Sequence, residues 1–201
     1  MKPMSTIKKL KAGEAVRIAA IGDSLTYGWM VSRGYLGYLR DMIAAQYPGA
    51  KFSIINAGIP GDTAEGGMHR IEYDVISRNP DCVLIQFALN DAFAGYPPPE
   101  FESNVRSMID RVRSSSRADM ILLTSVCLND EREDRFIDQY YGKLERLAEE
   151  YSLPLAAVHK YWREKISGGV QFGRLVQYDM VHPTEAGYKL MAEAVMEVFI
   201  D

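Results

Sequence analysis

Three residues from opposite ends of the chain could together form a nucleophile, its base and the group that orients the base. Ser24 lies in the segment Gly-Asp-Ser-Leu-Thr-Tyr-Gly, residues 22–28, and His182 follows Asp179 by three residues. A serine hydroxyl is a weak nucleophile at neutral pH and needs an adjacent base to accept its proton. An imidazole can accept that proton, while a carboxylate on its second ring nitrogen fixes the tautomer. We therefore predict Ser24 as the nucleophile, His182 as the base and Asp179 as its orienting partner.

Neither segment is specific alone, because Gly-Asp-Ser is also common in ordinary turns and Asp-x-x-His at helix N-terminal caps. The elements around them add the evidence. Near-continuous hydrophobicity predicts strands buried on both faces at residues 16–21, 52–57, 81–88, 120–126 and 153–158. Helical patterns lie between or after these segments, at residues 35–47, 101–112, 136–148 and 183–199, with Pro183 in the first turn of the last. This alternation predicts an α/β fold with a five-stranded parallel sheet covered on both sides.

The candidate residues follow the predicted strands at what should be one edge of the sheet. Ser24 comes after the first strand, residues 56–63 end the second, residues 88–91 end the third, and residues 179–182 lie beyond the fifth. Ligands of open parallel sheets bind beyond the carboxyl ends of the strands. Because the segments should converge on one rim, we interpret the pattern as that of a serine hydrolase.

Acyl transfer also requires hydrogen-bond donors for the oxyanion that forms on the substrate. We predict the backbone N–H groups of Ser24 and Gly58 and the side-chain amide of Asn90 as these donors. Gly58 lacks a Cβ, so its backbone can approach a reacting centre closely. Without Ser24 nearby, the same residues would be interpreted as a turn glycine and a loop cap.

These segments resemble, in order and spacing over essentially the whole chain, the blocks of the GDSL or SGNH hydrolase superfamily. Residues 22–28 resemble its first block, residues 56–63 the second with Gly58 in the donor position, residues 88–91 the third and residues 179–182 the fifth. One position departs from the pattern, since the third block usually begins with glycine and Ala88 stands there in this chain.

The resemblance implies a three-layer α/β/α sandwich with a flavodoxin-like strand order. It also implies hydrolysis of carboxylic esters through an acyl-serine, with no metal and no organic cofactor. We expect short acyl or acetyl esters as substrates, and a carbohydrate deacetylase is the first hypothesis because the compact chain lacks an obvious lipid-binding insertion. A lysophospholipase or thioesterase acting on longer acyl chains is the alternative. The non-enzymatic alternative is an acyl-sugar binding module with a relic triad.

Length and composition limit the other function classes. With 201 residues and 47% hydrophobic residues, we expect one domain over 1–201, with 1–14 as a peripheral or poorly ordered segment. The net charge of −4 and the absence of a long basic run predict a small-molecule ester partner and no nucleic acid. No segment has the apolar length of a secretory signal or a membrane span, so we expect no stable membrane insertion and a cytoplasmic location. Cys82 and Cys127 fall in or beside apolar segments and are predicted to be buried free thiols. The oligomeric state stays open.

Other residues of chemical interest have ordinary explanations. The chain has no Gly-x-Ser-x-Gly elbow, since Thr26 occupies the position of the second glycine, and no Gly-Lys-Ser/Thr phosphate loop. We expect His69 and His159 at the surface or core edge, the former on a solvated helix face with Arg70 and Glu72. The acidic residues Asp23, Asp62 and Asp91 are interpreted as turn and cap residues. Two alternatives stay open: the segment 27–30 could line a pocket or pack in the core, and the loop 96–99 could be a connection or a pocket wall.

Overall fold

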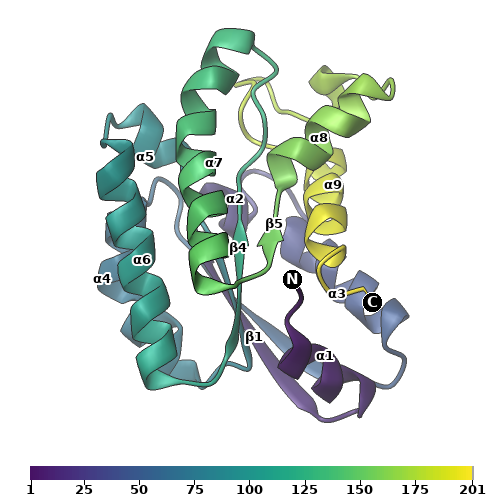
Figure 1. Ribbon diagram of the computed structural model, residues 1–201. Helices are drawn as coiled ribbons and strands as arrows, with labels where there is room; N and C mark the ends of the chain where they lie inside the picture. Colours follow the sequence, from purple (N-terminus) through teal and green to yellow (C-terminus); the bar gives the residue numbers. More distant parts are fainter. Residues whose placement is uncertain (201) are drawn as a thin grey trace.

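Five parallel strands form one sheet in the order β2-β1-β3-β4-β5 in the computed structural model, which describes residues 1–200 (Figure 1). Each connection between neighbouring parallel strands passes through at least one helix, as parallel pairing requires. The fold class predicted from the sequence is therefore confirmed. The strands are β1 (Ala15–Gly22), β2 (Lys51–Gly58), β3 (Cys82–Gln86), β4 (Asp119–Leu123) and β5 (Leu155–Ala156).

Helices cover the sheet on both faces (Figure 1). On one side α4 packs against α6 and α6 against α7, while on the other α9 packs against both α3 and α8. The helices are α1 (Met4–Lys11), α2 (Ser24–Tyr27), α3 (Tyr35–Gln46), α4 (Ala64–Asp74), α5 (Leu89–Phe93), α6 (Pro98–Ser115), α7 (Glu131–Tyr151), α8 (Val158–Ser167) and α9 (Glu185–Met196), with 3-10 turns η1 (Ile76–Arg78) and η2 (Phe172–Arg174).

Burial differs between the central and edge strands. All five residues of β3 are buried, whereas β2 has no fully buried residue and β5 has only two residues. The expectation that all five strands are buried on both faces is thus wrong for β2, because it pairs only with β1 and lies at the edge of the sheet. The predicted strand 153–158 shortens to Leu155–Ala156, and Pro154 just before it has no N–H to donate.

Two further observations concern the ends of the chain, and the first of them corrects an expectation. The last helix begins at Glu185 with Thr184 as its N-cap, so Pro183 precedes the helix instead of occupying its first turn. Residues 4–11, which we expected to be peripheral or poorly ordered, form helix α1 and bury Thr6, Ile7 and Leu10. Both the N–H and the hydroxyl of Thr6 donate to the Asp119 carboxylate, which ties α1 to the start of β4.

Local signals within helices α6 and α7 agree better with the structure. The helical pattern predicted at residues 101–112 falls within α6, and its apolar stripe is buried and consists of Phe101, Val105, Met108, Ile109 and Val112. Asp130 caps α7 by accepting hydrogen bonds from the amides of Arg132 and Glu133. Both cysteines are buried and free, as predicted. Within residues 1–200, no helix has the length and apolar character needed to cross a membrane.

Candidate active site

Ser24 stands at the first position of α2, directly beyond the carboxyl end of β1. Asp23 caps this short helix, because its Oδ1 accepts a hydrogen bond of 2.8 Å from the Leu25 amide. The Ser24 amide lies where no carbonyl of the same helix can accept its proton. The local fold therefore presents both the hydroxyl and the backbone N–H of one residue at the rim of the sheet.

His182 and Asp179 reach the same point from the loop between η2 and α9. Ser24 Oγ lies 2.9 Å from His182 Nε2, and His182 Nδ1 lies 2.6 Å from Asp179 Oδ2. An ionised carboxylate can only accept, so the proton of the imidazole lies on Nδ1 and the lone pair of Nε2 faces the serine. The structure thus brings together the three residues that the sequence predicted, across 158 positions of chain between Ser24 and His182.

The Asp179 carboxylate is held by its own loop. Its Oδ1 accepts hydrogen bonds from the amides of Val181 and His182, at 3.0 and 2.9 Å. Partial burial acts to raise the pKa of this carboxyl, but the two backbone bonds and the bond from the imidazole outweigh it and lower the pKa below its ordinary value. The partner of His182 is therefore ionised at neutral pH, as an orienting carboxylate must be.

A hollow of about 220 Å³ lies in front of these residues. Its polar side chains come from the triad, Asn90 and Asp23, and the rest of its wall is apolar. The lining residues are Asp23, Ser24, Leu25, Leu89, Asn90, Phe93, Asp179, Val181 and His182. The loop 96–99, which could have been a wall, is absent from this lining. The Tyr96 hydroxyl instead donates a hydrogen bond to the Glu65 carboxylate, and the Tyr96 carbonyl accepts one from the Tyr140 hydroxyl.

Asn90 lies at the start of α5, beyond the end of β3, and faces the loop that follows β2. Its Nδ2 donates a hydrogen bond of 2.8 Å to the carbonyl of Asp62, which leaves a second proton on the same nitrogen. Asn90 lines the hollow beside Ser24. An oxyanion formed at the serine could therefore take a hydrogen bond from this amide.

Gly58 has a different position from Asn90, because it does not line the hollow. Its N–H donates to the side chain of Asn56 at 2.9 Å, and Asn56 in turn donates to the carbonyl of Tyr27. A Cβ on Gly58 would lie 2.3 Å from the Tyr27 nitrogen, so glycine is required for β2 to approach the nucleophile helix. Its role as an oxyanion donor stays a prediction and requires Asn56 to release the amide.

Gly61 is a second candidate donor that the sequence analysis did not single out. It has a φ of +80°, and no hydrogen bond of its amide is present within residues 1–200. It directly precedes Asp62, whose carbonyl binds Asn90. Gly58 ends β2 and Gly61 lies three residues further on, and neither lines the hollow. The Gly58 amide is engaged by Asn56, which is a tertiary contact that the sequence does not reveal.

Ala88 directly precedes α5 and has an unusual backbone conformation. Its φ is 151° and it is fully buried, whereas residues other than glycine rarely adopt positive φ. The resemblance predicted glycine at this position. The structure therefore keeps the glycine-like backbone with alanine in place, and Asn90 still reaches the hollow.

Two buried carboxyl groups lie next to the proposed site residues in the chain, Asp23 beside Ser24 and Asp91 beside Asn90. Burial raises the pKa of Asp23 to about 7 although the Leu25 amide and the Gln86 side chain both donate to it. Burial also raises the pKa of Asp91 to about 7. Asp91 accepts the Ala64 amide at 2.9 Å with Oδ1, and its Oδ2 has no hydrogen-bond partner within residues 1–200. Both residues act as cap or loop groups, as the sequence indicated.

The two other histidines and residues 27–30 lie outside the lining of the hollow. His69 is exposed, and His159 is buried with its Nδ1 2.8 Å from the Thr124 hydroxyl. The open question about residues 27–30 is resolved against core packing, since Trp29 is 38% and Tyr27 54% exposed. The ring of Trp29 lies 6.2 Å from that of His182, outside the lining of the hollow.

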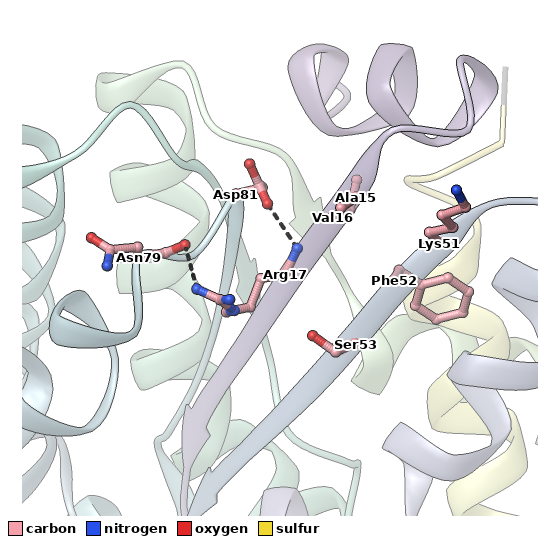
Figure 2. A pocket seen from close by; sticks show the side chains of 8 residues that line it. All are labelled: Ala15, Val16, Arg17, Lys51, Phe52, Ser53, Asn79 and Asp81. Atoms are coloured by element: carbon pink, nitrogen blue, oxygen red, sulfur yellow. Dashed lines mark hydrogen bonds between the residues drawn. The ribbon is translucent and has the colours of Figure 1, made fainter.

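A second hollow, of about 340 Å³, lies at the amino ends of β1 and β2 (Figure 2). Its charged groups are bonded to one another and to the backbone. Asp81 accepts the Arg17 amide, and the Arg17 guanidinium donates to the Asn79 carbonyl (Figure 2). Asp81 also accepts the Lys9 ammonium, and the Arg17 guanidinium also donates to the Arg78 carbonyl. No serine, histidine and carboxylate are arranged in succession among its lining residues, so the chemistry is expected at the smaller hollow.

Comparison with known proteins identifies a matching family, relatives and similar solved structures. The model of the GDSL-like lipase/acylhydrolase family matches residues 20–190. The acetylxylan esterase of Geobacillus stearothermophilus is 26% identical, with 93% of this chain and 95% of that protein covered, and the esterase TesA of Pseudomonas aeruginosa is 28% identical, with 90% and 86% covered. The crystal structure of the acetylxylan esterase Axe2 superposes with a TM-score of 0.82 at 25% identity, over 92% of this chain and 94% of that one.

Proposed function

Since the chain belongs to the GDSL-like lipase/acylhydrolase family, we propose that it hydrolyses esters with Ser24 as nucleophile, His182 as base and Asp179 as the orienting carboxylate. Family and relatives make the chain a carboxylic ester hydrolase of the GDSL type. The assignment of residues rests on one observation. Hydrogen-bond contacts of 2.9 and 2.6 Å link the serine hydroxyl, the imidazole and the carboxylate in succession.

The reaction follows from these contacts in two halves. Ser24 Oγ attacks the ester carbonyl carbon while His182 Nε2 takes its proton, and the carbonyl oxygen becomes an oxyanion. The oxyanion accepts hydrogen bonds from the Ser24 amide, from Asn90 and from the amide of either Gly58 or Gly61. Collapse of this intermediate breaks the bond to the alcohol, which leaves with the proton from His182. Water then attacks the acyl-serine, again with His182 as base, and releases the acid and the free serine.

The proposed oxyanion donors differ in whether they are already engaged in another hydrogen bond. The Ser24 amide and Asn90 are free to donate toward the hollow, while Gly58 is engaged by Asn56 and Gly61 is not. We keep Gly58 as the prediction made from sequence and add Gly61 as its rival. Alanine at either position changes the backbone as well as the donor, so the decisive measurement is a structure with a phosphonate bound to Ser24.

An acetyl ester of a carbohydrate is the substrate that we propose. A hollow of about 220 Å³ suits a short acyl group, and a relative of this chain is named for acetylxylan. The departing alcohol must lie beside His182, which protonates it. Trp29 is exposed next to that imidazole, and the exposed ring of Tyr27 lies 6.5 Å from that of Trp29, so the two offer an aromatic surface for the face of a sugar ring.

A longer acyl chain is the second candidate and has support of its own. Another relative, 24% identical over 91% of this chain, is the Thioesterase 1/protease 1/lysophospholipase L1 of Escherichia coli. The wall of the hollow is also partly apolar, through Leu89, Phe93 and Val181. Rates on p-nitrophenyl esters of increasing chain length separate the two candidates. The acetyl proposal expects kcat/KM to fall steadily beyond butyrate, and a maximum at octanoate or longer would favour the acylhydrolase.

A binding module with an inactive triad is the non-enzymatic candidate. It predicts that the wild-type protein binds an acetylated xylo-oligosaccharide without releasing acetate. Our proposal predicts acetate release by the wild type and its loss in Ser24→Ala, with the fold of the variant checked by circular dichroism. Release of acetate at wild-type rate by Ser24→Ala would overturn the assignment of the nucleophile.

A further inference from the structure

Arg70 is the one arginine of α4, and its guanidinium is turned into the protein toward residues 57–62. This segment includes Gly58 and Gly61, and we call it the glycine loop. The Arg70 side chain is 15% exposed. Nε donates to the Asp62 carboxylate at 2.7 Å, Nη1 donates to the Ala57 carbonyl at 2.6 Å and to Asp74 at 3.0 Å, and Nη2 donates to the Gly22 carbonyl at 3.0 Å. One planar group therefore serves four acceptors. From the sequence we expected Arg70 on a solvated helix face, but its side chain is mostly buried.

The acceptors of Arg70 are the backbone segments that carry the proposed oxyanion donors. Gly22 ends β1 two residues before Ser24, and Ala57 is the penultimate residue of β2. Asp62 begins the turn into α4 and offers its backbone carbonyl to Asn90 Nδ2. Arg70 thus connects the nucleophile strand, the glycine loop and, through Asp62, the amide of Asn90.

We propose that Arg70 is a positioning residue, which fixes the spacing between the Ser24 amide, the glycine loop and Asn90 and so sets the geometry of the oxyanion site. This inference rests on the proposed function of Ser24. The guanidinium itself lies outside the lining of the hollow, so it acts on the substrate only through these segments.

Only a guanidinium can form all four of these hydrogen bonds, and we call this set of bonds the Arg70 clamp. Arginine presents five N–H donors in a rigid fork, whereas lysine offers a compact point charge on a flexible stem. Lysine at position 70 could reach one or two of the acceptors and would leave the others without a donor. Because a displacement of about 1 Å in a reacting geometry can cost on the order of 100-fold in rate, the effect should fall on kcat.

The test compares Arg70→Lys with a matched variant, Arg106→Lys. Arg106, on α6, also donates from a guanidinium to a carboxylate, that of Glu150 on α7, forms an ion pair with Glu102 of its own helix, and does not line the hollow. We expect kcat on p-nitrophenyl acetate to fall about 10- to 100-fold in Arg70→Lys with KM within threefold, and to stay within twofold in Arg106→Lys. A folded Arg70→Lys protein with kcat within threefold of wild type overturns the proposal.

Chemical rescue provides a readout that loss of stability alone would not give. In Arg70→Ala, about 20–50 mM guanidinium, on the order of the millimolar dissociation constant expected for a weakly held cation, should restore kcat several-fold, while sodium chloride at equal ionic strength should not. If Arg70→Ala does not fold, the Arg70→Lys result decides. Wild-type activity that survives Ser24→Ala would refute the proposed function, whereas unchanged kcat in Arg70→Lys with Ser24→Ala inactive refutes only the clamp.

Discussion

Replacing Asp179 by asparagine removes one function of this residue and keeps the other. Oδ1 accepts the amides of Val181 and His182 and so shapes the loop, and the amide oxygen of asparagine can accept the same two bonds. The NH2 group then stands where Oδ2 lay, 2.6 Å from His182 Nδ1, and donates to it. The imidazole must accept at Nδ1 and carry its proton on Nε2, where it can no longer take the proton of Ser24.

The expected loss in kcat is large because every turnover needs that proton transfer. The same change in another serine hydrolase triad costs on the order of 10⁴-fold, which corresponds to about 5.4 kcal/mol of activation free energy. Stability should change much less, by under about 2 kcal/mol, because the two backbone hydrogen bonds persist and only the bond to the imidazole is altered. The separation of a large kinetic effect from a small thermodynamic one is the signature of the orienting role.

The assay is the steady-state hydrolysis of p-nitrophenyl acetate by Asp179→Asn, with urea unfolding of the same protein. Asp130→Asn is the matched control, since Asp130 also accepts two backbone amides, those of Arg132 and Glu133, but faces no histidine. The control should keep its kcat. A value of kcat for Asp179→Asn within tenfold of wild type would refute the reasoning about the tautomer.

Three other predictions concern backbone strain, pH and substrate. Ala88→Gly should raise the free energy of unfolding by about 1 kcal/mol, because relief of an unfavourable φ, worth about 1–3 kcal/mol, exceeds the entropic cost of glycine; lower stability in urea unfolding would contradict it. Burial raises the pKa of Asp91 to about 7, so the folded state binds more protons than the unfolded state between about pH 4 and 7, and stability falls as pH rises through that window. Asp91→Asn should remove on the order of 2 kcal/mol of the difference in unfolding free energy between pH 4.5 and 7.5, and an unchanged difference would refute the assignment. Trp29→Ala should raise KM for an acetylated xylo-oligosaccharide about 3- to 10-fold and leave hydrolysis of ethyl acetate unaltered; equal effects on both esters would remove the sugar-stacking role.

The sequence predicted the triad because each member belongs to a short local motif beside an element that could be recognised. Strands buried in the centre of a parallel sheet have continuous apolar runs, and their carboxyl ends meet at one rim. Ser24 and Asn90 follow β1 and β3, so their convergence could be predicted without coordinates. The loop that carries Asp179 and His182 is further from its strand than expected, since α8 and η2 lie between it and β5.

Arg70 shows where such reasoning ends. Two of its four acceptors are backbone carbonyls, which carry no sequence signal, and they belong to two different strands. In the sequence alone, Arg70 is simply an arginine between His69 and Glu72 on a polar helix face. The choice between Gly58 and Gly61 was hidden for the same reason, because it depends on whether Asn56 turns its side chain toward one amide.

The most direct test of the account is covalent labelling of the nucleophile. The wild-type protein is treated with a fluorophosphonate, and the adduct is located by peptide mass spectrometry. We predict one adduct per chain on Ser24, none on Ser24→Ala, and greatly slowed labelling of His182→Ala, because the hydroxyl then lacks the base 2.9 Å away. An adduct on a different residue, or ester hydrolysis that continues in the Ser24→Ala protein, would contradict the account.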